Sequence, residues 1–396
     1  MDDMRFFHHY LTAGYPYLPD GCDTVWITEI PLLAHQHEFL MHAIISLGAS
    51  HLSLVAIISL GASHLSLVAM AGSGLEEMHG YSTMLSHRGL ALRGLQQSID
   101  EHAHAGLPTA STMPNIPKLN AMFATCYALM TQSSHLRDGF TDFLILIRGS
   151  GPLTGHIAAI TGLDRNALLL SLKEGFDPRT RFSHLTLTGN DDAEDLDDDP
   201  GDAIDMGINM CVVKRFADAL RALIPLLQHE CHQNYYAAIL DAAEALQRRA
   251  WVDAFNSFHK TYVVLCTIDE VSFQNYIISP SVRGAGAGTG RRPKWEGEVE
   301  KNAMFLLLFM YLTALKVAMC PIIWRVIPER ALFPQMILPQ VSWLIDISAR
   351  ISPVLRGHVV LPLEVITRVG AEYGVFKSVF GERVREELTV RAEEMG

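Results

Sequence analysis

Apolar residues recur at helical spacing along most of the chain, and the strict alternation of apolar and polar positions that marks a β-strand is rare. Residues 81–99 are an example, and the glycines within them are tolerable in a helix. The residues that we place in the helical register of this segment are Met84, Leu90, Leu92 and Leu95. Residues 206–227 and 235–255 show the same pattern. The sequence therefore predicts an all-α fold, a bundle of many helices.

Three segments rich in proline, glycine or like charges interrupt this pattern and predict loops near residues 106–118, 188–203 and 280–297. The first carries Pro108 and Pro117, the second is acidic, and the third is glycine-rich and basic. The flanks of each segment are equally apolar. We therefore expect one helical domain that comprises residues 1–396.

An identical tandem repeat, AIISLGASHLSLV, occupies residues 43–55 and again residues 56–68. Two short copies do not make a solenoid. In one continuous helix at ~100° per residue, thirteen residues rotate the second copy by about 140° relative to the first. Both copies cannot then present the same face to one core, so one copy is predicted to be surplus to the original fold.

Composition and charge narrow the function classes. With 49% apolar residues, 396 residues can bury a large core. The net charge of −12 repels the phosphate backbone of nucleic acids, so we do not expect this chain to contact DNA directly. The six cysteines show no C-x-x-C spacing, which argues against a zinc cluster or a compact disulfide framework and favours a reducing, intracellular compartment.

Two apolar stretches pass a crude length test for membrane spans. Residues 43–69 carry no acidic or basic side chain but contain serines, histidines and glycines, and residues 303–323 carry Lys316 near the middle. A charge at mid-span is costly in a bilayer, whereas a buried helix of a soluble core needs nothing special. Asp2, Asp3 and Arg5 near the start do not fit a secretory signal. We therefore predict no membrane partner.

The acidic loop contains Asp191, Asp192 and Asp195, the D-D-x-x-D pattern with which helical terpene cyclases hold magnesium and diphosphate. The Asn, Ser and Glu set that completes such a site does not follow on a later helix. Because Pro200 and Gly201 lie in the same run of like charge, we favour a solvated loop.

Histidine pairs offer weaker candidates for metal binding. His229, Cys231 and His232 surround Glu230, but they do not form the H-E-x-x-H motif, and further ligands would have to come from elsewhere. The remaining pairs, whose spacing of two splays side chains apart on a helix, are His35 with His37 and His102 with His104. We therefore favour no metal site and assign no cofactor.

Other catalytic and phosphate-binding signals are also incomplete. Ser150 lies in RGSG, not in a G-x-S-x-G elbow, and it follows an apolar helix instead of a strand. The glycines of residues 284–290 match neither a P-loop nor a dinucleotide fingerprint. The basic residues that follow, too few to indicate nuclear import or RNA binding, are Arg291, Arg292 and Lys294. We assign no catalytic residue and expect no enzyme.

Three segments resemble the fungal-specific transcription factor family, in the branch that includes sterol uptake control proteins and many regulators of secondary-metabolite gene clusters. The first runs from FFHHYLTAGYPYL at Phe6, through Trp26, to HEFLMHAIISLGASHL at Leu52. The second is residues 124–151, preceded by HRGLALRGL from His87, and the third is residues 259–277 with the apolar stretch to Pro321. Together they span most of the chain.

This resemblance implies an α-helical regulatory domain in the nucleus that controls a metabolic or secondary-metabolite gene cluster. It implies partners in the transcription machinery and an apolar, sterol-like molecule as a candidate ligand. DNA is reached indirectly or through a zinc cluster that these residues lack, and a homodimer is plausible by analogy with factors that read paired half-sites. Residues 304–310, rich in methionine and aromatics, suit a pocket wall, but plain core needs the same residues, so no pocket residue is named.

Two alternatives stay open. One is a helical magnesium-dependent enzyme of the terpene cyclase type that uses the aspartates of residues 191–195, which requires these carboxylates to face a cavity. The other is a membrane-associated protein, which fails if the purified protein is soluble without detergent.

Overall fold

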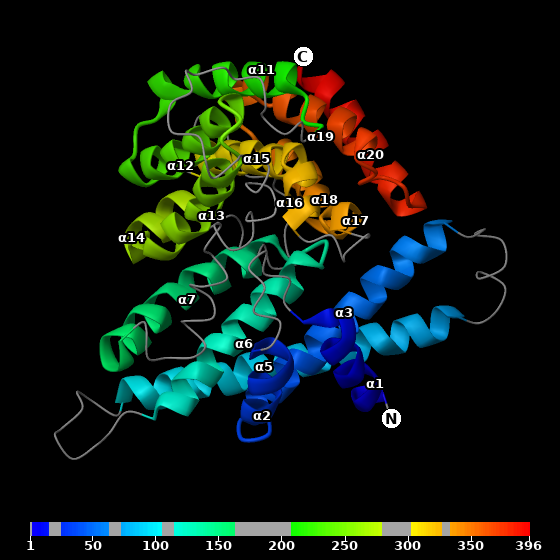
Figure 1. The fold of residues 1–396 in the computed structure, drawn as a ribbon, viewed down its shortest axis with the longest axis vertical. Helices are drawn as coiled ribbons and strands as arrows, with labels where there is room; N and C mark the ends of the chain where they lie inside the picture. Colours follow the sequence, from blue (N-terminus) through cyan, green and yellow to red (C-terminus); the bar gives the residue numbers. More distant parts are fainter. Residues whose placement is uncertain are drawn as a thin grey trace, which may run out of the picture. The chain divides into compact units, whose positions relative to one another are not determined.

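The computed structural model describes residues 2–15, 25–62, 73–104, 115–162, 207–278, 302–326 and 333–396. Every regular element within these residues is a helix, mostly α with short π and 3₁₀ turns (Figure 1). The prediction of an all-α, multi-helix fold is therefore confirmed. The predicted loops at 188–203 and 280–297, with Asp191, Asp192, Asp195 and the glycines of 284–290, lie outside the described residues.

Contacts between residues divide the chain into two compact units. Unit 1 comprises residues 1–206, 321–340 and 373–383, and unit 2 comprises residues 207–320, 341–372 and 384–396. Each unit is discontinuous, because the chain returns to the first after it has built most of the second. The expectation of a single domain stays a prediction.

Unit 1 is built around one long helix, α3, which packs against α5, α6 and α1 (Figure 1). Two very bulky side chains of its core, Trp26 and Tyr10, are fully buried beside Leu40 and Ile44 of α3. Burial of each such side chain stabilises the fold by roughly 1.5–3 kcal/mol. Its main elements are α1 (Asp2–His9), η1 (Tyr10–Gly14), η2 (Val25–Glu29), α2 (Ile30–Ala34), α3 (Glu38–Ala62), α5 (Ser73–His104), α6 (Ile116–Ser134), α7 (Phe140–Thr161), α17 (Phe333–Met336) and, from its second residue, α16 (Cys320–Val326).

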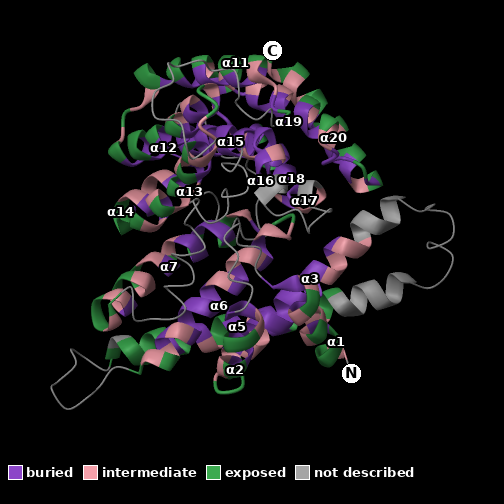
Figure 2. Ribbon diagram, in the orientation of Figure 1, coloured by how far each residue is buried: buried purple, intermediate pink, exposed green. Residues whose placement is uncertain are grey.

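Unit 2 surrounds helix α15 (Ala303–Ala318), which is buried along its length apart from Lys316 (Figure 2). The neighbours of α15 include α12 and α19. All seven residues of 304–310 are buried in this core. The other elements are α11 (Met210–Arg221), η5 (Ile224–Leu226), α12 (Glu230–Gln247), α13 (Trp251–Thr267), α14 (Glu270–Ser272), η6 (Phe273–Ile277), η7 (Pro353–His358) and α19 (Val360–Glu372), while α18 (Leu338–Arg350) and α20 (Val379–Met395) each contain a boundary between the units.

The helical pattern of residues 235–255 hides a break between α12 and α13. The amide of Arg249 donates to the carbonyl of Leu246, and that of Ala250 donates to the carbonyl of Ala245. Together with the positive φ of 57° at Arg249, these bonds form a Schellman motif, which usually contains glycine at this position. Because arginine takes the left-handed conformation here, the sequence pattern contains no stop signal.

Two further boundaries differ from the sequence expectations. The pattern at 206–227 yields a helix from Met210 to Arg221, because Asn209 caps its start and Pro225 follows in a separate 3₁₀ turn. Helix α6 begins at Ile116, inside the predicted loop 106–118, since Asn115 caps it and proline is tolerated in a first helical turn.

The first copy of the tandem repeat lies in α3, which continues through the start of the second copy to Ala62. Ile44 and Leu47 of the first copy are fully buried in the core of unit 1. Deletion of residues 56–68 keeps the sequence 43–55 and its preceding residues unchanged. We therefore expect the unfolding temperature of the deletion variant, followed by circular dichroism, to stay within about 3 °C of the parent.

The matched destabilised reference is Ile44→Ala, which removes a fully buried side chain and is expected to cost about 3 kcal/mol. A deletion variant as unstable as Ile44→Ala would show that the second copy also belongs to the folded core.

Two described helices are long and apolar enough to span a membrane by length and composition, Glu38–Ala56 within α3 and α7. The first is 61% buried within the protein, as expected of a core helix, and the second is 33% buried. The expected candidate at 303–323 corresponds to the shorter apolar helix α15. Core helices of soluble proteins pass the same test, so this finding carries no membrane assignment.

Candidate functional site

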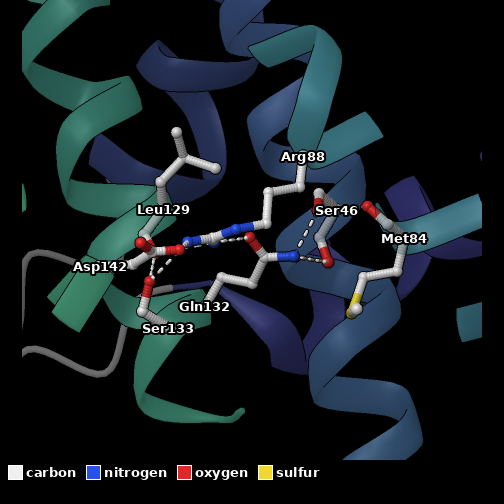
Figure 3. A network of polar contacts seen from close by, with 7 residues as sticks. All are labelled: Ser46, Met84, Arg88, Leu129, Gln132, Ser133 and Asp142. Carbon is white, nitrogen blue, oxygen red and sulfur yellow. Dashed lines mark hydrogen bonds and ion pairs between the residues drawn. The ribbon is translucent and has the colours of Figure 1, made fainter. Parts of the chain in front are cut away.

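A buried arginine lies at the centre of the polar contacts inside unit 1. Arg88 is on the inward face of α5, and its side chain is 7% exposed. Its Nη1 donates to Oε1 of Gln132 at 2.5 Å, and its Nη2 donates to Oγ of Ser133 at 2.9 Å and to Oδ2 of Asp142 at 2.7 Å (Figure 3). The guanidinium therefore links α5 to α6 and α7 through bonds in which its charge strengthens the hydrogen bonding.

The network continues from α6 to α3. The amide of Gln132 donates to Oγ and to the carbonyl oxygen of Ser46, and Ser46 Oγ donates to the carbonyl of Met84 at 2.9 Å (Figure 3). Ser46 and Gln132 are fully buried. Because the partners satisfy one another, the interior of unit 1 tolerates a permanent positive charge among four helices.

The turn between α6 and α7 sets the position of the Asp142 carboxylate. Gly139 packs against the backbone of Ser133 so closely that a Cβ atom would overlap the Ser133 carbonyl. This contact folds the start of α7 onto the end of α6 and places Asp142 in the first turn of α7. A carboxylate is favoured there by the helix dipole as well as by Arg88. The Asp142 side chain is 52% exposed, so one end of the network reaches solvent.

A line of histidines and carboxylates lies beside this network. His42 of α3 and His87 of α5 face each other with their Nδ1 atoms 2.8 Å apart. Nε2 of His87 is 3.1 Å from Oδ1 of Asp3, and Nε2 of His42 is 3.6 Å from Oε1 of Glu38. The carboxylates approach the far nitrogens of the rings, so the four groups form a chain and do not converge on one point.

Burial is the main cause that lowers the pKa of His42, and the neighbouring His87 lowers it further, whereas Glu38 and Asp3 oppose the shift. The neutral form is therefore favoured at His42 relative to a histidine in water.

A second histidine pair lies at the other end of α1. Nε2 of His9 is 2.8 Å from Nδ1 of His51, and the ring of His51 packs edge-on against His135. Oγ of Ser50 is 3.4 Å from Nδ1 of His135. Burial is the largest cause of the lowered pKa of His9, and the positive charges of Arg5 and His8 add to it.

The polar residues of α3 follow a simple spacing. His42, Ser46 and Ser50 are four residues apart and thus share one face of the helix. This face meets α5 and α6, where it finds His87, Gln132 and His135. Together these contacts fix the register of the helices.

The histidines and the cysteine considered as metal ligands near the start of α12 do not point towards one common position. The ring of His229 stacks on Tyr276 with centroids 3.9 Å apart, and Nε2 of His232 lies 3.3 Å from the carbonyl oxygen of Tyr276. Cys231, which lies between these two histidines in the sequence, is buried. Within the described ranges no group of three or more histidine, cysteine or acidic side chains is arranged to hold a metal ion.

The other candidates lie apart from the Arg88 network. His35 and His37 are in the turn before α3, and Ser150 Oγ donates to the carbonyl of Ile147 within α7. His102 faces His156 of α7 with Nε2 atoms 3.2 Å apart, while His104 contacts the carbonyl of Asp100. Arg291, Arg292 and Lys294 lie outside the described residues.

The sequence interpretation of residues 81–99 placed Met84 and Leu95 correctly on the buried face, but it also placed Leu90 and Leu92 there and missed Arg88. Leu90 and Leu92 are 38% and 37% exposed, whereas the buried side of α5 carries Met84, Arg88 and Leu95. Arg88 follows Met84 by four residues and precedes Leu95 by seven, which is the spacing of one helical face. A charged residue at a buried position of the helical register is thus the signal that identifies the network.

Part of the chain matches a curated protein. The matched segment is 41% identical over 54 residues to Sterol uptake control protein 2 of Saccharomyces cerevisiae. It covers 13% of this chain and 6% of the length of that protein. No family model matches, and no solved structure matches. The match supports a loose resemblance to the fungal zinc-cluster regulators and hints at transcriptional regulation.

Proposed function

We propose that this chain is the regulatory region of a fungal transcriptional regulator that acts in the nucleus through protein partners. The observation that carries the proposal is the segment similar to Sterol uptake control protein 2. The proposal assigns the chain a binding role and no catalysis, and it includes control of a metabolic or secondary-metabolite gene cluster. DNA is reached indirectly or through a zinc cluster outside these residues, and a sterol-like ligand and a homodimer belong to the same proposal.

The architecture of unit 1 agrees with this proposal. The first two stretches that resemble the family, residues 6–52 and 124–151, contribute α1, α3, α6 and the start of α7 to one core. Arg88, next to His87 in HRGLALRGL, bonds to residues of the second stretch. These two stretches are therefore neighbours in space within one helical core, while the third, residues 259–277, belongs to unit 2.

The first experiment tests whether the chain regulates transcription. The complete chain is fused to a heterologous DNA-binding domain that has no regulatory activity of its own, and transcription of a reporter gene is measured in yeast. We expect a change of about tenfold relative to the DNA-binding domain alone. An unchanged reporter, with a soluble fusion present in the nucleus, would overturn the proposal.

Two matched substitutions on α5 test whether the reporter response depends on the buried network or only on the loss of an arginine. Arg88→Met removes the centre of the buried network, whereas Arg93→Met replaces an exposed arginine on the same helix. We expect Arg93→Met to keep the reporter response and Arg88→Met to lose it.

Deletion of the gene in its host, followed by RNA sequencing, tests the proposed control of a gene cluster. The proposal predicts that the transcripts whose levels change come mainly from one contiguous cluster of genes.

A further inference from the structure

Helix α1 contacts α3 at very short range where the two helices cross. A Cβ atom at Gly48 of α3 would overlap the carbonyl oxygen of Phe6, so glycine is required for this approach. The Phe6 side chain is 5% exposed and forms a small apolar cluster with Ile45, Ala49 and Met84. Helix α1 therefore covers apolar side chains of both α3 and α5.

Polar contacts at both ends of α1 hold it across this crossing. Near its start, Asp3 contacts His87 of α5, and His87 in turn contacts His42 of α3. At its end, His9 contacts His51 of α3. Both ends of α1 are thus attached through a pair of histidines whose ring nitrogens are 2.8 Å apart.

A pair of ring nitrogens at this distance needs one proton between them, because one nitrogen donates and the other accepts. The His42–His87 pair tolerates one extra proton, because both outer nitrogens then carry hydrogen and each faces a carboxylate. Nε2 of His87 donates to Asp3, and Nε2 of His42 lies within ion-pair distance of Glu38. A second extra proton places two N–H groups face to face, and the pair must separate. The same limit on the number of protons between the facing nitrogens applies to His9 and His51.

The charged surroundings of the two pairs differ. Asp3 and Glu38 flank the His42–His87 pair and stabilise its positive form. Near the His9–His51 pair, the charges of Arg5 and His8 instead lower the pKa of His9, and the ring of His135 packs against His51. The contact at His9 is therefore expected to open first as the pH falls.

We propose that α1 is an acid-released cover of the α3–α5 pair, held by the His9–His51 and His42–His87 contacts and opened when both rings of a pair are protonated. Release of α1 exposes the apolar side chains of Ile45, Ala49 and Met84. This proposal concerns a conformational change within unit 1 and does not depend on the proposed role in transcription.

Hydrogen exchange measured by mass spectrometry tests the proposal on the full chain. Protection factors, corrected for intrinsic exchange rates, are compared at pH 7.5 and pH 5.0 for residues 2–14 and for α6. We expect protection of residues 2–14 to fall by about tenfold or more on acidification while α6 keeps its protection. Equal protection of α1 at both pH values would refute the proposal, as would a parallel loss in α6.

Two variants identify the groups responsible. Asp3→Asn removes a carboxylate that favours the protonated form of His42 while α1 is in place, so α1 is expected to be released at a higher pH than in the parent. The double variant His9→Gln and His42→Gln keeps a hydrogen-bonding side chain without titration, and its α1 is expected to stay protected at pH 5.0. His104→Gln, an exposed position on α5, is the matched control and should leave the pH dependence unchanged.

If the double variant loses protection of α1 already at pH 7.5, the decisive measurement is the pH at which α1 is released in Asp3→Asn compared with the parent. A release pH identical to that of the parent in Asp3→Asn would then exclude the His42–His87 contact from the mechanism.

Discussion

Replacement of Arg88 by methionine is expected to lower the stability of unit 1 by about 3 kcal/mol. The substitution keeps an apolar side chain of similar length but leaves Gln132 and Ser133, both fully buried, without a donor for their oxygens. Each buried polar group that loses its partner costs about 1–3 kcal/mol. Asp142 adds less, because its half-exposed carboxylate can return to water.

The free energy of opening measured by hydrogen exchange in α6 is the appropriate measurement, since it reports on unit 1 alone. Arg93→Met is the control and should change this free energy by less than about 0.5 kcal/mol. Asp142→Asn should have an intermediate effect. If Arg88→Met and Arg93→Met are equally stable, the network contributes no more than an exposed side chain.

Helical periodicity was sufficient to predict the fold class, because apolar residues three and four apart specify a helix wherever one face is buried. It was not sufficient for the inner face of α5. In LALRGL the leucines at 90 and 92 outweigh Ala91 in hydrophobicity, yet Ala91 is the buried residue because helix α3 approaches α5 closely. Where two helices cross closely, the buried positions take small residues because only these leave room for the neighbouring helix. A pattern based on hydrophobicity alone does not identify such positions.

The partners of Arg88 could not be predicted from the sequence, for a different reason. Arg88 is 44 residues from Gln132 and 54 residues from Asp142, and an arginine in a helix is usually a solvated side chain. Its partners reach it through the packing of α5 on α6 and the Gly139 turn between α6 and α7, which are tertiary features. The four-residue spacing of His42, Ser46 and Ser50 was visible in the sequence, but the residues that face them were not.

Acidification is expected to destabilise unit 2 through His232. The pKa of this histidine is lowered from 6.5 to about 4, mainly by burial and also by the nearby His229, while the hydrogen bond to the Tyr276 carbonyl opposes the shift. The unfolded chain therefore binds a proton before the folded chain does. The contribution of His232 to stability is fully present above pH 6.5 and is lost as the pH falls through this value towards 4.

The difference of about 2.5 pKa units corresponds to about 3 kcal/mol at the acid limit. Urea unfolding at pH 7.5 and pH 4.5 gives the loss of unfolding free energy on acidification for the parent and for His232→Leu, whose leucine cannot titrate. The difference between the two losses is the contribution of His232. We expect this difference to be about 2.5 kcal/mol at pH 4.5.

His259, whose pKa burial also lowers to about 4, is present in both proteins, so its effect cancels in the comparison. His104→Gln should retain the acid sensitivity of the parent, because His104 is exposed at the end of α5. Equal acid sensitivity of the parent and His232→Leu would mean that His232 is protonated in the folded protein without strain. In that case the interior at the start of α12 would have to admit water to the ring, since a buried imidazolium beside His229 requires solvation or a counter-charge.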